Sequence, residues 1–373
     1  MHLYSQRLLK NLKLRGRFVL AKPTLMRLRT VEVPKIRHMD RQKTLLTRLV
    51  SPVVVAVDPA VATALDIVPF ALGSDTGGSI RLPASFNGVV GVKPTYGTVS
   101  RYGVVAMASS TDTIGVFTTN VADAELVMDI MSGNDPKDMT TLANFFIPKQ
   151  TIEPKRKIGL IKEFMTDDVD PEVRQRTLEY VQRLRNDGHT VEDVSLPIVA
   201  HTLAMYYIIV PAEVSSNLAR YDGIRYGHRA QGAKTLAELY GRTRDEGFET
   251  ENKRRIMIGS YVLSSGYFDA YYLQAQKART LLIAEFNALF EQYDILLGPV
   301  SPTPAFKLGE NTSDPIKMYL ADIMTVPASL AGLPAISVPA GVNGSGLPIG
   351  VQLIGQRRSD ADLLALARSV EEK

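Results

Sequence analysis

The 373-residue chain contains no cysteine, so it can form neither a disulfide framework nor a thiolate metal site. Its five histidines are scattered and show no metal-ligand spacing such as HExxH, which argues against a metal enzyme. We find no run of about 18 apolar residues, so the sequence predicts no membrane-spanning segment. With 45% hydrophobic residues, the chain can still bury a large core, as one large α/β domain or two smaller ones.

Charge is distributed unevenly along the chain. Residues 1–50 carry 13 Lys and Arg against two acidic residues, a net charge of +11, whereas the remainder has a net charge of −7. A basic arm on an acidic body is typical of a nucleic-acid-binding arm or an organellar transit peptide, and it also arises in a sequence never selected as protein. Ser5 is the single serine of the arm, which argues against a transit peptide.

Regular periodicity begins near residue 60, where residues 60–72 indicate a small-residue helix followed by a short apolar strand. Further helices are predicted at 121–132, 171–187 and 361–372, and long helical stretches at 202–221 and 251–292. Strands bounded by Pro or Gly are predicted at 157–161, 295–299 and 336–342. This alternation favours an α/β sheet with helices on its faces. We find no repeat and no low-complexity linker, which favours one domain with a largely helical insertion near 195–290.

Two of the helices carry signals for where they begin, end and pack. Asn120 is a plausible N-cap for the helix at 121–132. The helix at 171–187 is expected to stop at Gly188. Its buried face is expected to consist of four apolar side chains, those of Val173, Leu178, Val181 and Leu184.

The segment Gly73–Ala84, with the sequence GSDTGGSIRLPA, is the most informative for chemistry. A Gly-Gly pair before a serine allows a tight turn that exposes backbone N–H groups and a hydroxyl together. Acyl transfer requires such an arrangement of a nucleophile beside an oxyanion hole. The GGS tripeptide taken alone fits an ordinary surface loop better than a catalytic one. A phosphate loop is disfavoured because the Lys-Ser/Thr ending is absent.

The longer string GSDTGGSIRLPASFNGVVGVKPTYGTVSRYG, at residues 73–103, resembles the signature of the amidase family. The resemblance implies an amidase-signature fold, an α/β fold with a mixed β-sheet covered by helices. It also implies that Ser79 is the acyl nucleophile, and that Asp75 and Arg81 brace the turn as a buried ion pair. The implied oxyanion hole consists of three backbone N–H groups, those of Thr76, Gly77 and Gly78.

Four later segments resemble the glutaminase subunits of tRNA-dependent amidotransferases within that family; they lie at 215–229, 253–279, 296–306 and 322–341. In those subunits a Tyr, an Arg and an Asp bind free glutamine, and the matching residues here are Tyr206, Arg255 and Asp322. An arginine can hold a carboxylate bidentately and an aspartate can take an ammonium group. Taken alone, Arg255 also fits a solvated helix face, Tyr206 or Tyr207 a core position, and Asp322 a helix cap.

The resemblance implies a Ser–Ser–Lys mechanism, in which a neutral lysine and a middle serine relay the proton of the nucleophile. The middle serine of the family lies in a GGSSGGSA segment. Here residues 52–60 are PVVVAVDPA, so Val55 occupies its place, and the base lysine would precede Met1. We therefore expect the chain to be catalytically inactive.

This departure has an explanation in the codons. With permitted codons, Pro52–Pro59 shifted by one base encodes GGSSGGS, and the same shift gives family-like strings for 34–52 and 21–26. We hypothesise that residues 1–58 are an out-of-frame, non-native segment. Residues 59–373 would then be an amidase-signature domain whose N-terminal part is missing or scrambled, with a helical insertion at about 195–290. Such a domain exposes core surface, so we expect poor solubility or dependence on partners.

The expected function is that of a glutaminase subunit, which hydrolyses glutamine and supplies ammonia to convert Glu-tRNA(Gln), or Asp-tRNA(Asn), to the amidated form. The alternatives are a small-molecule amidase of the same family and a non-catalytic scaffold subunit. The resemblance implies no cofactor here, because ATP and Mg²⁺ serve the partner subunit. It also implies subunits B and C as partners in a heterotrimer, with tRNA held mainly by the partner. A bacterial cytoplasm is expected, with an organelle as the alternative.

Overall fold

The computed structural model describes residues 57–143, 146–149, 155–307 and 320–371. The basic arm and Val55 lie outside these residues, as does the proposed out-of-frame segment except for its last two positions. Those predictions therefore stay predictions.

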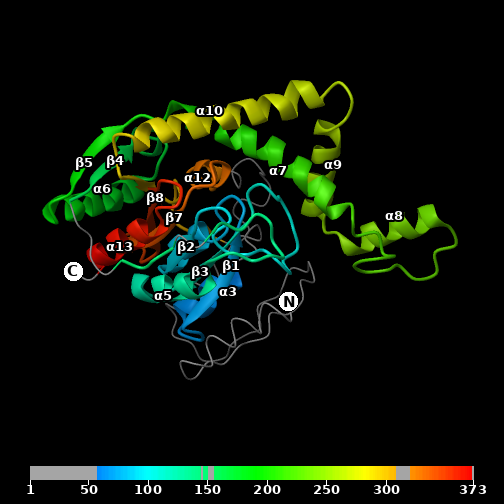
Figure 1. The fold of residues 1–373 in the computed structure, drawn as a ribbon, viewed down its shortest axis with the longest axis horizontal. Helices are drawn as coiled ribbons and strands as arrows, with labels where there is room; N and C mark the ends of the chain where they lie inside the picture. The colour runs from blue at the N-terminus through cyan, green and yellow to red at the C-terminus, as the bar shows by residue number, and fades with distance from the viewer. Residues whose placement is uncertain (1–56, 144–145, 150–154, 308–319, 372–373) are drawn as a thin grey trace.

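A mixed eight-stranded sheet forms the centre of the molecule, in the order β1-β3-β2-β7-β8-β6-β4-β5 (Figure 1). Strand β4 runs parallel to β5 and β6, and every other neighbouring pair is antiparallel. The predicted α/β fold with a mixed sheet is confirmed. The strands are β1 (Phe70–Asp75), β2 (Val90–Lys93), β3 (Thr113–Thr118), β4 (Lys157–Ile161), β5 (Thr190–Val194), β6 (Ile295–Pro299), β7 (Ala335–Val342) and β8 (Pro348–Gly355).

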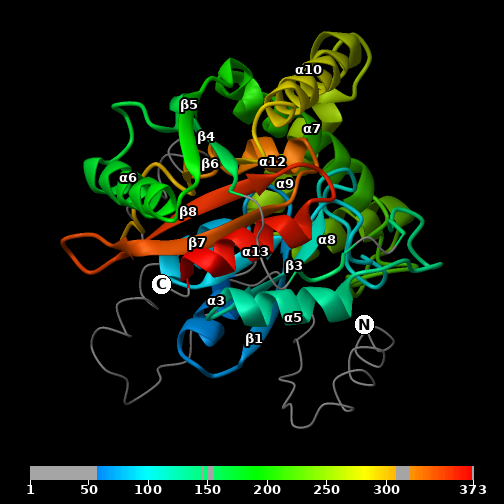
Figure 2. The ribbon, with the colours of Figure 1, turned by 60° about the vertical axis from the view of Figure 1, so that its left-hand side comes forward.

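Helices cover both faces of the sheet (Figure 2). One face packs against α5 (Val121–Met131), α6 (Pro171–Asn186) and α13 (Asp360–Glu371). The other packs against α7 (Thr202–Leu218), α10 (Leu273–Phe290) and α12 (Val326–Leu330). Successive strand residues point to opposite faces, so Leu353 of β8 belongs to the first core and Ile354 to the second. The central strands are therefore apolar on both faces, as expected of a sheet that helices cover on both sides.

Two short helices lie near the N-terminal end of the described chain, α3 (Val57–Ala64) before β1 and α4 (Arg81–Asn87) after it. The stretch between β5 and β6 is helical and leaves the sheet; in Figure 1, α8 projects away from the body of the molecule. Its further elements are η2 (Pro197–His201), α8 (Leu236–Gly247), α9 (Thr250–Val262) and the π-helical turn η3 (Phe268–Tyr272). A short 3-10 turn, η1 (Lys162–Phe164), follows β4.

Several local predictions are confirmed. The strands at 157–161 and 295–299 have the predicted bounds. The Asn120 side chain accepts the Asp123 N–H at 2.8 Å as an N-cap. Helix α6 ends just before Gly188, whose φ of +88° belongs to the left-handed region that favours glycine.

One local prediction is wrong. Leu178 of α6 is 51% exposed, because the buried stripe passes through Thr177 instead, whose hydroxyl donates to the Val173 carbonyl. The helical stretch predicted at 251–292 is confirmed, and it consists of α9, the π-helical turn η3 and α10. The helical segment Pro197–Leu218 has the length and apolar composition of a membrane-spanning helix. Half of its most apolar stretch is buried within the protein, so it is a core helix by its packing.

Candidate active site

The Gly-rich segment forms a tight loop between β1 and α4, and two close approaches explain its glycines. A Cβ at Gly77 would lie 2.6 Å from the Tyr206 hydroxyl oxygen, and a Cβ at Gly78 would lie 2.2 Å from Thr325 Oγ1. Both distances are too short for a side chain. Gly78 also has a φ of +149°, which glycine adopts without strain. The loop is therefore pressed between α7 and the segment that leads into α12.

Four hydrogen-bond donors of this loop have no partner among the described residues. The backbone N–H groups of Thr76, Gly77 and Gly78 make no hydrogen bond there, although both glycines are buried. The half-buried Ser79 hydroxyl likewise has none within the described ranges. Buried N–H groups are seldom left unpaired in folded proteins without a reason. Chemically, such a loop can offer N–H donors to an anionic oxygen next to a hydroxyl nucleophile.

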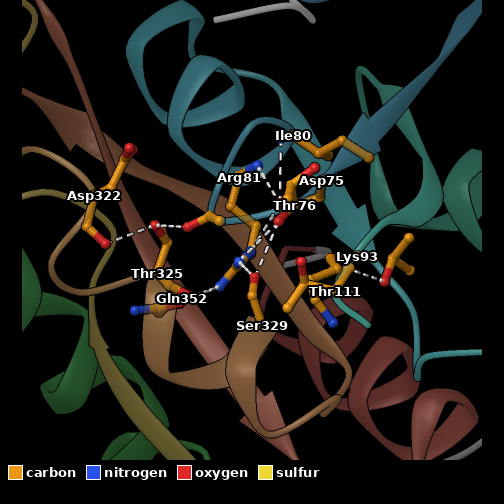
Figure 3. A network of polar contacts seen from close by, with 12 residues as sticks. Asp75, Thr76, Ile80, Arg81, Lys93, Thr111, Asp322, Thr325, Ser329 and Gln352 are labelled. Atoms are coloured by element: carbon orange, nitrogen blue, oxygen red, sulfur yellow. Dashed lines mark hydrogen bonds and ion pairs between the residues drawn. The ribbon is translucent and has the colours of Figure 1, made fainter. Parts of the chain in front are cut away.

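The predicted buried ion pair beneath the loop is confirmed (Figure 3). Arg81 Nη2 donates to Asp75 Oδ1 at 3.0 Å and Nε donates to Oδ2 at 3.1 Å, and both side chains are fully buried. Burial by itself would raise the pKa of Asp75, but the charge and hydrogen bonds of Arg81 hold that pKa below its ordinary value. Asp75 also accepts the Ile80 N–H at 3.2 Å, so the pair closes the turn from below.

Arg81 extends this brace to other parts of the chain. Its Nη1 donates to the Thr325 carbonyl at 2.8 Å and to Gln352 Oε1 at 3.3 Å, and its Nη2 donates to Ser329 Oγ at 2.8 Å. Gln352 in turn donates to the Met324 carbonyl at 2.6 Å. The Gly-rich loop, α12 and β8 therefore share one buried polar network.

A second brace was not predicted from the sequence. Thr76 Oγ1 donates to Asp112 Oδ1 at 2.7 Å, and Asp112 Oδ2 accepts the Met107 and Ala108 N–H groups at 2.8 and 3.0 Å. Burial raises the pKa of Asp112 even though these hydrogen bonds favour the ionised form. The carboxylate thus ties the start of the loop to the 107–112 segment.

The predicted glutamine ligands come from three segments. Tyr206 of α7 is 5% exposed, and its hydroxyl is the one that faces Gly77, which distinguishes it from the neighbouring Tyr207. The Arg255 side chain of α9 is 16% exposed and Nε donates to Glu251 Oε1 at 2.9 Å, whereas the Arg254 side chain is 44% exposed. Arg255 is therefore not part of a solvated helix face.

Asp322 is not a helix cap. It lies before α12, whose first turn has no side-chain cap, and the Asp322 backbone carbonyl, not its carboxylate, accepts the Thr325 and Val326 N–H groups at 3.0 Å. The carboxylate makes no hydrogen bond to any residue in the described part of the chain. It thus remains available to a ligand.

Electrostatics joins Tyr206, Arg255 and Asp322 into one group. Burial raises the pKa of Asp322 to about 7, although the charge of Arg255 opposes the shift. Burial also raises the pKa of Tyr206, again opposed by Arg255. Burial would lower the pKa of Arg255 itself, but Tyr206 and Glu251 raise it above its ordinary value. The structure therefore brings the three predicted ligands near one another and near the loop.

A buried lysine lies close to this network but does not serve as a base for Ser79 in this arrangement. Lys93 Nζ donates to the Leu333 carbonyl at 2.6 Å and to the Pro94 carbonyl at 3.3 Å. Burial, together with the charge of Arg81, lowers its pKa to about 7. Within the described residues, no lysine hydrogen-bonds to Ser79, and no group of three or more His, Asp or Glu could hold a metal ion.

Comparison with known proteins gives one family model and several similar sequences. The model of the family described as Amidase matches residues 59–364. The A subunit of glutamyl-tRNA(Gln) amidotransferase from Sulfurihydrogenibium sp. is 50% identical over 312 residues, which cover 83% of this chain and 64% of that protein. The protein of the same name from Halothermothrix orenii is 50% identical, with 84% of this chain and 66% of that protein covered. The chain thus spans just under two thirds of the length of these relatives.

Solved structures agree with this result. The crystal structure of the glutamyl-tRNA(Gln) amidotransferase A subunit from Thermotoga maritima has a TM-score of 0.70 at 42% identity, covering 84% of this chain and 64% of that one. The crystal structure of an amidase has a TM-score of 0.68 at 29% identity, covering 84% and 65%. The matched family model covers most of the chain, including the loop and the residues around it. The chain belongs to the amidase family.

Proposed function

We propose that this chain derives from the glutaminase subunit of a tRNA-dependent amidotransferase and that Ser79 is its acyl nucleophile. The observation that carries the proposal is the position of the Ser79 loop, with its unpaired N–H groups, beside a tyrosine, an arginine and a carboxylate from three distant segments. The names of the two relatives described above support the same function.

In the proposed reaction, Arg255 holds the α-carboxylate of glutamine and Asp322 holds its ammonium group, while the Tyr206 hydroxyl lies over the loop. Ser79 Oγ attacks the side-chain amide carbon, and the N–H groups of the loop stabilise the resulting oxyanion. The C–N bond then breaks and ammonia leaves with the proton taken from the serine. Water hydrolyses the glutamyl ester, which releases glutamate and restores Ser79.

The proton transfer requires groups that correspond to positions outside the described residues. We propose that the middle serine of the family was lost through an out-of-frame segment at residues 1–58, whereas the base lysine corresponds to a position before Met1. The match to the family model begins at residue 59, which supports this boundary. Sequencing the gene from upstream of Met1 through the Ser79 codon tests it. A frame without a GGSSGGS coding string before residue 60 refutes the idea.

The partners and the compartment follow from the same proposal. We propose subunits B and C as partners in a heterotrimer, with the charged tRNA bound mainly by the partner subunit. ATP and Mg²⁺ would act in that partner, and this chain would need no cofactor. The proposed compartment is the bacterial cytoplasm.

Hydrolysis of glutamine by a repaired chain tests the function. Residues 1–58 are replaced by the corresponding family segment with the middle serine and the lysine, and ammonia release is measured with L-glutamine, L-asparagine and a simple aliphatic amide. We expect a clear preference for glutamine and its loss in Ser79→Ala. Equal rates on all amides would favour a small-molecule amidase. A scaffold function would be favoured by two results together. The unrepaired chain would co-purify with subunits B and C, and the repaired chain would release no ammonia.

A further inference from the structure

The peptide group between Gly77 and Gly78 has the least intrinsic restraint in the loop. It is flanked by two glycines, which tolerate most backbone conformations. Because a trans peptide is planar, its carbonyl and its N–H point in opposite directions. The group that holds the Gly77 carbonyl therefore decides where the Gly78 N–H, a proposed oxyanion donor, points.

Thr325 holds that carbonyl. Its Oγ1 donates to the Gly77 oxygen at 2.7 Å, in a fully buried environment, and the same hydroxyl lies 3.0 Å from the Asp322 carbonyl (Figure 3). Thr325 is itself fixed, because Arg81 donates to its backbone carbonyl at 2.8 Å. The close approach of Thr325 Oγ1 also explains why position 78 must be glycine.

The other two braces do not perform this task. Asp112 holds the side chain of Thr76, and Asp75 accepts the Ile80 N–H. The first contact precedes the Gly77–Gly78 peptide in the chain and the second follows it, so neither restrains the rotation of this peptide. Within the described residues, the Thr325 hydroxyl is the group that hydrogen-bonds to the Gly77 carbonyl.

Thr325 is also tied to the proposed ligand of the substrate ammonium group. Its N–H donates to the Asp322 carbonyl at 3.0 Å, so a single turn carries the Asp322 carboxylate and the Thr325 hydroxyl. We propose that Thr325 is a positioning residue that aims the Gly78 N–H at the oxyanion and couples this donor to occupancy of the Asp322 site. The inference rests on the proposed role of Ser79.

The sequence permits a selective measurement, because Gly77–Gly78 is its single Gly-Gly bond. Labelling the full-length chain with carbonyl-¹³C-glycine and ¹⁵N-glycine makes this peptide the one directly bonded ¹³C–¹⁵N pair. Its amide order parameter is measured by NMR in the unaltered chain, Thr325→Val, Thr325→Ser and Thr177→Val. Thr177 is a matched control, since its buried hydroxyl donates to a backbone carbonyl at 2.8 Å within α6, outside the loop network.

We expect the order parameter of the Gly78 amide to fall from about 0.85 to below about 0.6 in Thr325→Val. It should stay near the unaltered value in Thr325→Ser, which keeps the hydroxyl, and in Thr177→Val. An unchanged order parameter in Thr325→Val, or the same loss in Thr177→Val, overturns the positioning role.

Addition of L-glutamine tests the coupling. A shift of the labelled signal in the unaltered chain and in Thr325→Ser, but not in Thr325→Val, supports it, and equal shifts in all variants overturn it. If calorimetry detects no glutamine binding by the unaltered chain, the coupling fails, and glutamine hydrolysis by the repaired chain decides the proposed function separately. The ligand-free order parameters still decide whether Thr325 holds the peptide.

Discussion

Removal of Arg81 should destabilise the protein far more than removal of a surface arginine. In Arg81→Met the Asp75 carboxylate keeps the Ile80 N–H and the Ser329 hydroxyl as hydrogen-bond partners but loses its charged partner. Thr325 also loses the donor to its backbone carbonyl. The variant therefore leaves a fully buried carboxylate without its ion-pair partner, and the charge of Lys93 is the remaining electrostatic support.

The expected cost follows from the loss of that ion-pair partner. Breaking a buried ion pair by removing one partner typically costs about 3–5 kcal/mol. At about 2.1 cal/mol/K of unfolding entropy per residue, that loss corresponds to a decrease in melting temperature of roughly 4–6 °C for a chain of 373 residues. Because Arg81 holds the pKa of Asp75 below its ordinary value, the pair stabilises the fold at neutral pH, and this contribution is lost as the pH falls below about 4. The difference between variant and unaltered chain should therefore shrink in acid.

Far-UV circular dichroism during thermal and urea unfolding is a suitable assay, because the sequence contains no tryptophan. Arg174→Met is the control, since Arg174 pairs with the fully exposed Asp167. We expect no measurable change there. The double variant Asp75→Asn/Arg81→Met should lose less than the sum of the single variants, because neither charge remains. Additive losses, or an Arg81→Met variant as stable as Arg174→Met, refute the argument.

Three further predictions concern glutamine hydrolysis by the repaired chain. Gly77→Ala should lower kcat by at least about 100-fold while the circular dichroism spectrum stays normal. The added Cβ would lie 2.6 Å from the Tyr206 hydroxyl oxygen and would push that hydroxyl out of position. A kcat near the normal value would show that the loop tolerates this shift. Arg255→Lys should raise KM for glutamine about tenfold through loss of bidentate binding, and Arg254→Lys should not; equal effects in steady-state kinetics would count against Arg255 as the ligand. Affinity for glutamine should rise as the pH increases through about 7, because Asp322 must be ionised to bind an ammonium group. Asp322→Asn should remove this step from the pH profile of kcat/KM, and a step that persists would assign it to another group.

Local signals account for the parts of the fold that the sequence predicted. Helix α6 begins after Asp170, which caps the Glu172 N–H at 2.8 Å, and ends before Gly188. Strands β2, β3, β5 and β8 were missed, because β2, β3 and β8 are buried along their whole length and show no alternation, while β5 is largely exposed. Which strand pairs with which is decided by long-range packing, on which periodicity carries no information.

The same division applies to the site. The loop itself could be predicted, because its glycines, its serine and both members of the ion pair lie within one short segment. Asp75 and Arg81 are six residues apart. Its other supports could not be predicted in this way. Asp112 reaches Thr76 from 36 residues away, and Thr325 reaches Gly77 from 248 residues away. A buried threonine is chemically ordinary, and the fold alone gives its hydroxyl a function.

Binding and chemistry should be separable in the 373-residue chain. The three proposed glutamine ligands and the Ser79 loop lie within the described residues, whereas the proposed proton relay corresponds to positions outside them. Calorimetry should therefore detect L-glutamine binding, which Arg255→Met abolishes, while a coupled assay detects no ammonia. A correctly folded chain that binds no glutamine would mean that residues of the missing family segment complete the ligand site. Ammonia release that disappears in Ser79→Ala would mean that the chain has another proton acceptor, and the loss of the relay would then not explain inactivity. Glutamine binding without ammonia release is the one result that supports both the proposed ligand site and the proposed loss of the proton relay.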